Sequence, residues 1–353
     1  MTNAPIEVSW WKIWIPVALG VLTAAFLFWK HFDPQVLLQL RFDWQTGMWL
    51  AIALLFLIAR HFIYMLRIMV LTEGWLGWRS AFEVITLWEF ATVITPPVVG
   101  GSAAALFLLN REGLPLGRST ATVIAVIFLD HLLFVLIAPV FFLVFRDLLF
   151  SDAQALTTTF WFAYTIFTGY TVLLALGLLI KPRLLMVVLI SIFSLPLLRR
   201  WKKGAMKMAR DIYYTAEHFK HAGISYWLLL LGLTGLGWLF RFLNLNAVVV
   251  AFAGSLSLFE HIILIARQTV MWVLLLVSPT PGGSGTAEFA FVEILYGLVN
   301  RGAASLLAFL WRLVSFYPYL IAGVIILPLW LKRVQQHHPS SLKRLPTFKG
   351  KTK

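Results

Sequence analysis

The chain of 353 residues contains no cysteine, and its charged residues are scarce, at 12 per cent. Without cysteine there can be no disulfide bond, thiolate metal site or cysteine nucleophile. Hydrophobic residues make up 60 per cent of the chain, and its mean hydropathy is +0.86. So few polar residues could not cover a soluble core of this size. We therefore expect an all-α protein that crosses a membrane many times.

Motifs that would mark an enzyme or an ATP-driven pump are also missing. The sequence has no Gly-x-x-x-x-Gly-Lys-Ser/Thr phosphate loop, no Asp-x-Asp cluster and no Gly-x-Ser-x-Gly nucleophile elbow. His61, His131 and His261 stand singly in apolar stretches, where packing or hydrogen bonding is their commoner role. We therefore expect no catalytic residue, no metal site and no cofactor.

Long apolar runs recur along the whole chain. About 20 such residues in a helix cross a hydrocarbon core of about 30 Å. The expected spans are residues 11–29, 47–69, 79–98, 119–145, 160–180, 226–243, 247–266, 269–299 and 303–331. This pattern predicts about eight or nine transmembrane segments, depending on how the interrupted runs are counted.

The net charge of +14 is unevenly distributed. Of the 29 lysines and arginines, nine lie between residues 181 and 220 and seven between residues 332 and 353. An excess of Lys and Arg in loops marks the cytoplasmic side. Both segments are thus expected to face the cytoplasm from the inner membrane, with an even number of crossings between them. No separate basic domain exists in the sequence, so nucleic acid is not an expected partner.

These patterns predict one membrane domain, residues 1–335, followed by a basic and disordered tail, residues 336–353. The domain would consist of a first half at about 10–180, a basic connector at 181–223 and a second half at 224–331. The two halves are expected to be copies of one duplicated unit.

The connector contains apolar residues at near-helical spacing, with basic residues between them. The apolar positions are Trp201, Met208, Ile212 and Phe219. Two interpretations stay open. The segment is either an amphipathic helix on the inner leaflet or a solvated link between the two membrane halves.

The most informative feature is a Pro/Gly motif that occurs twice, 182 residues apart. Pro97-x-x-Gly100-Gly101-Ser102-x-x-Ala105 is matched by Pro279-x-x-Gly282-Gly283-Ser284-x-x-Ala287. Proline and paired glycines both break helices. Interruptions at corresponding positions of two halves point to a transport site built from discontinuous helices. Each half is therefore expected to contain a broken or re-entrant helix, and the sequence does not decide between these two forms.

A helix that restarts after Gly-Gly-Ser offers free N–H groups and the positive end of its dipole to a phosphate or carboxylate. We expect the glycines and serines of both motifs to contact such a head group, and the prolines to break the helices. The head-group residues are Gly100, Gly101, Ser102, Gly282, Gly283 and Ser284; the helix breaks are Pro97, Pro279 and Pro281. The alternative is that these small residues only allow helices to pack closely.

Ionisable residues within the expected spans are costly, so each is a functional candidate. Glu83, Glu89, Asp130, Glu288 and Arg312 are among them. Asp130, Glu288 and Arg312 are assigned to local charge or gating, and we hypothesise that Arg312 pairs with Glu288 or with Asp130. Structural ion pairing between helices is the simpler explanation for all of them.

The second motif carries a family resemblance. The run Ser278-Pro-Thr-Pro-Gly-Gly-Ser-Gly-Thr-Ala-Glu288, followed by Leu310-Trp-Arg-Leu-Val-Ser-Phe-Tyr317, resembles the flippase-like membrane domain of the lysylphosphatidylglycerol synthase family, which includes the multiple peptide resistance factor. In the first half, Thr95-Pro-Pro-Val-Val-Gly-Gly-Ser102 and Leu109-Asn-Arg-Glu-Gly113 occupy the corresponding place. The resemblance covers roughly residues 10–331, without the soluble synthase domain.

The resemblance implies movement of a phospholipid, such as aminoacylated phosphatidylglycerol, or of a polyprenyl-phosphate-linked glycan between leaflets. Pro281, Gly282, Gly283, Gly285, Glu288 and Arg312 match the family pattern. The chain departs from the pattern where it has Ala287, Ala103 to Ala105 and Asp130-His131 in place of more strongly charged residues. These departures reduce the positive charge along a head-group path.

We therefore expect a protein that translocates a phospholipid or lipid-linked head group. Expected partners are membrane lipids, among them anionic lipids or polyprenyl phosphates, and a synthase or glycosyltransferase. One alternative is a proton-coupled transporter of small solutes, with Glu83, Glu89 and Asp130 as proton carriers. Another is an accessory protein or transferase for polyprenyl-phosphate-linked glycans. The energy source, the direction of movement and the oligomeric state stay open.

Overall fold

A computed structural model describes residues 43–94, 100–149, 153–192, 194, 202–277, 291, 294, 295, 297–299 and 301–337. All regular structure in these residues is helical, which confirms the expected all-α membrane protein. Five segments are long and apolar enough to cross a membrane: Trp44–Leu71, Leu116–Leu149, Thr157–Ile180, Ile224–Ala253 and Leu307–Gln336. The total of eight or nine spans stays a prediction.

The helices of the first half are α3 (Trp44–Leu71), α4 (Trp78–Ile94), α5 (Gly100–Arg111), α6 (Leu116–Leu149) and α7 (Ala153–Ala175), which continues into the π-helix η1 (Leu176–Ile180). The connector contains α8 (Arg183–Ile192) and α9 (Lys202–Lys220). The second half contains α10 (Ile224–Ala253), α11 (Leu258–Val277), α13 (Arg301–Ser315) and α14 (Tyr317–His337).

Several helix ends follow ordinary local chemistry. Asp43 precedes α3, and its carboxylate accepts hydrogen bonds from the N–H and hydroxyl of Thr46, at 2.8 and 2.9 Å. These bonds hold the pKa of the Asp43 carboxyl below its usual value. Ser257 and Glu260 form a reciprocal capping box at the start of α11. Gly254 ends α10 at a φ of 97°, a conformation that favours glycine.

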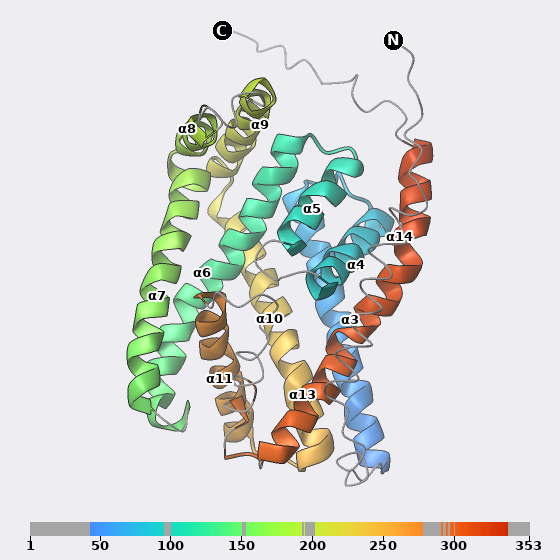
Figure 1. The fold of residues 1–353 in the computed structure, drawn as a ribbon, viewed down its shortest axis with the longest axis vertical. Helices are drawn as coiled ribbons and strands as arrows, with labels where there is room; N and C mark the ends of the chain where they lie inside the picture. Colours follow the sequence, from blue (N-terminus) through green and yellow to red (C-terminus); the bar gives the residue numbers. More distant parts are fainter. Residues whose placement is uncertain are drawn as a thin grey trace.

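Long helices run along the length of the molecule, and the described parts of the two basic segments lie at the same end of it (Figure 1). We call this the basic end: it holds α8, α9 and the last turn of α14. The shared location agrees with the expected even number of crossings between the segments. Which side of the membrane the basic end faces stays a prediction.

The first interruption is a re-entrant hairpin, because α4 and α5 both have an end at the basic end (Figure 1). The turns before α4 and after α5 touch: the Trp75 indole N–H donates to the Glu112 carbonyl at 3.2 Å. The 17 residues of α4 and the 12 of α5 extend only about 26 and 18 Å at 1.5 Å per residue. Neither arm is long enough to cross the bilayer by itself.

The interface between α3 and α10 is the most extensive in the described fold, and the two helices are antiparallel. Thr46 bonds to the carbonyl of Ala251 near one end, Asn244 to that of Ala53 farther along, and Arg67 to Thr234 near the other end. Adding the motif offset of 182 to the residue numbers of α3 gives a range within α10. If the halves are a duplication, they therefore have inverted topology. In agreement with this, α4 starts toward the basic end and α11 starts at the opposite end of the molecule (Figure 1).

One expected boundary is wrong. The separate spans predicted at 226–243 and 247–266 are replaced by a continuous α10 and by α11, with the break at residues 254–257. Asn244 and Asn246 had the appearance of a polar break, but both are buried inside α10. Their amides find partners on neighbouring helices, so the chain can keep them at membrane depth.

The connector contains the helix α9, and the apolar face of this helix packs against the protein. Ile212 and Phe219 are buried, while Arg210 and Tyr214 are exposed. A Cβ at Gly117, in the first turn of α6, would lie 2.8 Å from backbone atoms of α9. The glycine thus allows the close contact that joins the connector to the membrane helices.

Large apolar side chains remain exposed along the outside of the long helices. Examples are Leu55 and Ile58 on α3 and Phe162 and Leu173 on α7, each more than half exposed. Such surfaces would be a liability in water but are suited to contact with lipid tails.

Candidate functional site

Seven of the expected site residues lie outside the described residues: Pro97, Pro279, Pro281, Gly282, Gly283, Ser284 and Glu288. Gly100, Gly101, Ser102, Asp130 and Arg312 are described. The structure therefore tests the surroundings of the first motif and of Asp130, and the contacts of the second motif stay predictions.

The first motif restarts a helix as expected, because α5 begins at Gly100. Gly101 is buried against α4, where a Cβ would lie 2.4 Å from the Thr92 hydroxyl and 3.5 Å from the Trp88 indole nitrogen. Close packing of the two hairpin arms thus accounts for this glycine. Ser102 follows in the first turn and is half-buried. The first-turn N–H groups of α5 have no intrahelical partner, which is the property that suits an anion.

Asp130 of α6 is the centre of a polar contact between three helices. Its carboxylate accepts from Arg67 of α3 at 2.6 Å and from the indole N–H of Trp238 of α10 at 3.1 Å. Arg67 also donates to Thr234 of α10 at 3.3 Å. The hypothesis that Asp130 pairs with Arg312 is therefore wrong: among the described residues, the Asp130 carboxylate is bonded to Arg67 and Trp238 instead. The pairing of Arg312 with Glu288 lies outside the described residues.

A second ion pair joins α3 to the hairpin. Arg60 donates to Glu89 of α4 at 3.0 Å, and the two side chains are 4 and 19 per cent exposed. The Arg60 guanidinium also lies over the rings of Tyr64 and Tyr319, at 5.6 and 5.3 Å. His61 contacts the Tyr319 hydroxyl at 3.3 Å. The pair thus links α3, α4 and α14 inside the bundle.

Arg241 of α10 completes what we call the intramembrane cluster. The members are Arg60, Tyr64, Arg67, Glu89, Asp130, Trp238 and Arg241. The register of the α3 and α10 pair, set by Arg67 opposite Thr234, places Arg60 and Arg241 at the same level. Three arginines share the cluster with two carboxylates, so the cluster carries an excess of positive charge.

Sequence reasoning missed all three of these arginines. Arg60 and Arg67 occur in an expected span, 47–69, and Arg241 occurs in another, 226–243. The signal that could have found them is the one applied to the acidic residues: a charge in the middle of an apolar run is costly unless it has a partner or a function.

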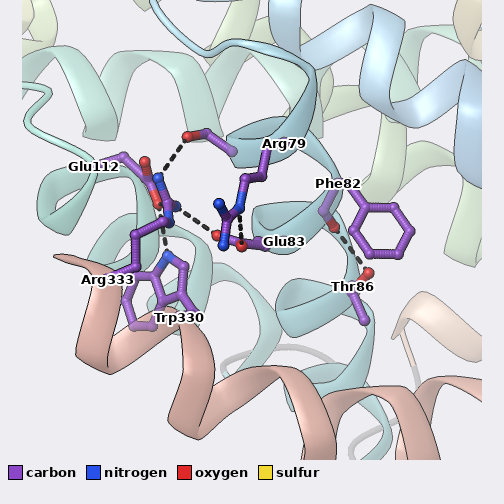
Figure 2. A network of polar contacts seen from close by, with 8 residues as sticks. Arg79, Phe82, Glu83, Thr86, Glu112, Trp330 and Arg333 are labelled. Carbon is purple, nitrogen blue, oxygen red and sulfur yellow. Dashed lines mark hydrogen bonds and ion pairs between the residues drawn. The ribbon is translucent and has the colours of Figure 1, made fainter.

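A second cluster lies near the basic end, around Arg333 of α14 (Figure 2). Arg333 forms ion pairs with Glu83 of α4, at 2.6 Å, and with Glu112 after α5, and it donates to Ser80 at 3.1 Å. Trp330 donates to the same Glu112 carboxylate at 2.6 Å. We call this the Arg333 cluster. It fastens the last helix of the second half to both arms of the hairpin.

Polar contacts within the second half are made mainly by neutral side chains. Asn244 accepts from the Ser315 hydroxyl at 2.5 Å, and Gln268 donates to Asn246 at 3.2 Å. Arg267 donates to the carbonyl of Leu148 at 2.6 Å, which joins α11 to the end of α6. These contacts connect α10, α11 and α13 and use little ion pairing among the residues that the structure describes.

Metal coordination has no candidate in the described ranges, where no three His, Asp or Glu side chains gather in a metal-binding arrangement. The chemistry available in the intramembrane cluster is instead that of arginine, indole and phenol groups. Such groups bind anions by charge and hydrogen bonding.

Comparison with known proteins identifies the family of the chain. The family model described as the lysylphosphatidylglycerol synthase TM region matches residues 13–323. The chain is 27 per cent identical over 296 residues to a UPF0104 membrane protein of Archaeoglobus fulgidus. The aligned region covers 78 per cent of this chain and 85 per cent of the relative. No solved structure matches the chain. The chain is therefore a multi-pass membrane protein that belongs to the lysylphosphatidylglycerol synthase TM region family.

Proposed function

We propose that the protein translocates a phospholipid or a lipid-linked head group between the leaflets of the inner membrane. The observation that carries this proposal is the intramembrane cluster. Its excess of arginine lies at the interface between α3 and α10, the helices that the repeat offset relates. Transporters with inverted repeats hold their substrates at such an interface, close to interrupted helices.

In the proposed mechanism the head group enters the bundle while its acyl chains stay in lipid. The first-turn N–H groups of α5, at Gly100, Gly101 and Ser102, would donate to its phosphate oxygens. The second motif, through Gly282, Gly283 and Ser284, would do the same from the other half, with Glu288 and Arg312 setting the local charge. Breaks at Pro97, Pro279 and Pro281 would keep both helix ends at membrane depth.

The proposal also orients the protein. The positive-inside rule places the basic end, with the connector and the tail, in the cytoplasm. A lipid synthase or glycosyltransferase that acts at the cytoplasmic leaflet would then supply the lipid. The alternative of proton-coupled solute transport receives less support, because Glu83, Glu89 and Asp130 each have an arginine as ion-pair partner. Ion pairing between helices accounts for these carboxylates without proton transfer.

The test is leaflet exchange of fluorescent phosphatidylglycerol, phosphatidylethanolamine and a polyprenyl phosphate in liposomes that contain the purified protein. We expect exchange of at least one lipid above that of empty liposomes, and its loss in Gly283→Val. No exchange of any of them by folded protein would contradict the proposal. A glycan or lipid-modification defect in cells without translocation would favour an accessory role.

A further inference from the structure

We infer that Arg241 is an anion-binding residue that recognises a phosphate group within the membrane, with a lipid phosphate as its ligand. The inference rests on the proposed function, because it names the chemical group that a translocated lipid would present. Arg241 lies 12 residues from the Ala253 end of α10, or about 18 Å along the helix, and farther than that from the Ile224 end. It is therefore deep within an apolar segment.

Two tryptophans that pack against each other also contact the Arg241 guanidinium. Its central carbon lies 5.1 Å from the ring centroid of Trp238 and 4.7 Å from that of Trp272 on α11. The two indoles pack edge to face, with centroids 5.2 Å apart. Cation–π contacts offset part of the cost of a charge at this depth. They leave the N–H donors of the guanidinium unused, because ring faces attract the cation without accepting in-plane hydrogen bonds.

Protein acceptors do not use these donors in the described part of the chain. The Nε–H of Arg241 is buried without a hydrogen-bond partner. The two carboxylates of the intramembrane cluster have other arginine partners: Asp130 pairs with Arg67, and Glu89 pairs with Arg60. Trp238 separates Asp130 from Arg241, since its N–H donates to Asp130 while its ring face contacts the arginine. Arg241 is only half-buried, so its site is not sealed.

A phosphate group fits this arrangement chemically. The planar guanidinium can donate two parallel N–H bonds to two phosphate oxygens. An anionic phosphodiester would supply the negative charge that the cluster of three arginines and two carboxylates lacks. A zwitterionic lipid carries the same phosphate but brings a compensating amine. We therefore expect anionic lipids to be preferred.

The first test compares exchange of fluorescent phosphatidylglycerol with that of fluorescent phosphatidylcholine. Wild type should prefer the anionic lipid. Arg241→Gln should lose roughly tenfold in phosphatidylglycerol exchange, the scale of one charge-assisted contact, and should lose less in phosphatidylcholine exchange, so that the preference for the anionic lipid shrinks. Arg111→Gln is the matched control: this exposed arginine lies 5.1 Å from the ring of Phe107 near the basic end, so its loss should leave the preference intact.

The second test measures binding without transport. Thermal unfolding of the detergent-purified full chain is followed with short-chain phosphatidylglycerol or with inorganic phosphate. We expect the ligand to stabilise wild type and not Arg241→Gln. Arg241→Lys keeps the positive charge but not the two parallel N–H donors of the guanidinium, so it should keep part of the stabilisation. Stabilisation by the lipid alone identifies a lipid phosphate as the ligand. Equal stabilisation by inorganic phosphate would overturn the lipid assignment.

The two tests separate the inference from the proposed function. Lipid exchange by wild type, with a preference and a stabilisation that do not depend on Arg241, would overturn the inference and leave translocation intact. No exchange by wild type, together with a phosphatidylglycerol stabilisation that Arg241→Gln abolishes, would contradict translocation and support the site. If Arg241→Gln does not fold, Arg241→Lys carries the same comparison, and unchanged values in that variant would count against the inference.

Discussion

Among the residues that the structure describes, the two halves join their helices through different side-chain chemistry. In the first half, α3, α4 and α6 are joined inside the membrane by the ion pairs Arg60–Glu89 and Arg67–Asp130. In the second half, α10, α11 and α13 are joined by amide and hydroxyl groups, such as Asn244 with Ser315. Neutral groups can hold helices together at membrane depth, so structural need alone does not require the charges of the first half. This difference is why we assign the head-group chemistry to the charged side of the interface.

Among the substitutions that test this difference between the halves, Arg67→Ala is expected to cause the largest loss of unfolding free energy. The substitution leaves the Asp130 carboxylate, bonded to Arg67 at 2.6 Å, without its charged partner. Loss of one member of a buried pair costs about 3–5 kcal/mol of unfolding free energy. The loss of unfolding free energy is measured by denaturant unfolding of the protein in detergent. Arg118→Ala, which removes a partly exposed pair with Glu73, is the control and should cost about 1 kcal/mol or less.

A smaller effect is expected where the halves touch through a glycine. A Cβ at Gly323 of α14 would lie 2.2 Å from the ring of Phe90 on α4, so Gly323→Leu must push the two helices apart. Overpacking of this kind costs about 1–3 kcal/mol. The same unfolding experiment on Gly232→Leu is the control, since that exposed glycine of α10 has no atom within 4 Å of its Cβ position. Equal losses in both variants would show that helix contact is not the cause.

The amide network should be less sensitive than the ion pairs. Asn244→Ala removes the bonds to the Ala53 carbonyl and to Ser315. Interhelical hydrogen bonds in membranes contribute about 0.6 kcal/mol on average and about 1.7 at most. Thr165→Ala, whose exposed hydroxyl bonds only within α7, should be near zero. A cost for Asn244→Ala as large as that of Arg67→Ala would break the proposed difference between the halves.

The smallest effect is expected at the edge of the Arg333 cluster. Arg79 pairs with Glu83 at 3.1 Å, but its side chain is 75 per cent exposed (Figure 2). Arg79→Gln should therefore change the unfolding free energy by about 0.5 kcal/mol or less. Arg333→Gln, which leaves two buried carboxylates without their shared partner, should cost several times more in the same measurement.

The sequence predicts the helical elements well where hydrophobic periodicity is unbroken. The expected spans 119–145 and 160–180 lie within α6 and within α7 with η1. In the connector, where a helix was one of two interpretations, α9 forms. The sequence does not decide whether the first interrupted helix is broken or re-entrant. That choice depends on which end of the bundle each of its two arms lies at, and this is set by packing between distant helices. The span boundary expected near Asn244 is wrong for a similar reason. The group that satisfies the Asn244 amide, the Ala53 carbonyl, is 191 positions away in the chain, so the sequence near Asn244 does not show it.

The candidate site is less predictable than the fold. Asp130 was found because a carboxylate in an apolar run is conspicuous, but its partner could not be chosen from sequence, since helix packing decides it. Arg67 lies near the end of its expected span, 47–69, where an arginine usually reaches the membrane surface. In the structure Arg67 bonds to Asp130 of α6 and to Thr234 of α10, so the side chain points inward instead.

The central claim is that the intramembrane cluster, and not the Arg333 cluster, carries lipid movement. The most direct measurement is phosphatidylglycerol exchange in liposomes by two variants whose folding is checked first by thermal unfolding. One is Arg67→Gln with Asp130→Asn, which neutralises an intramembrane pair, and the other is Arg333→Lys, which alters the cluster near the basic end. The account predicts that the first variant loses exchange and that the second retains most of it. Normal exchange by the first variant, or exchange lost only in the second, would contradict the account.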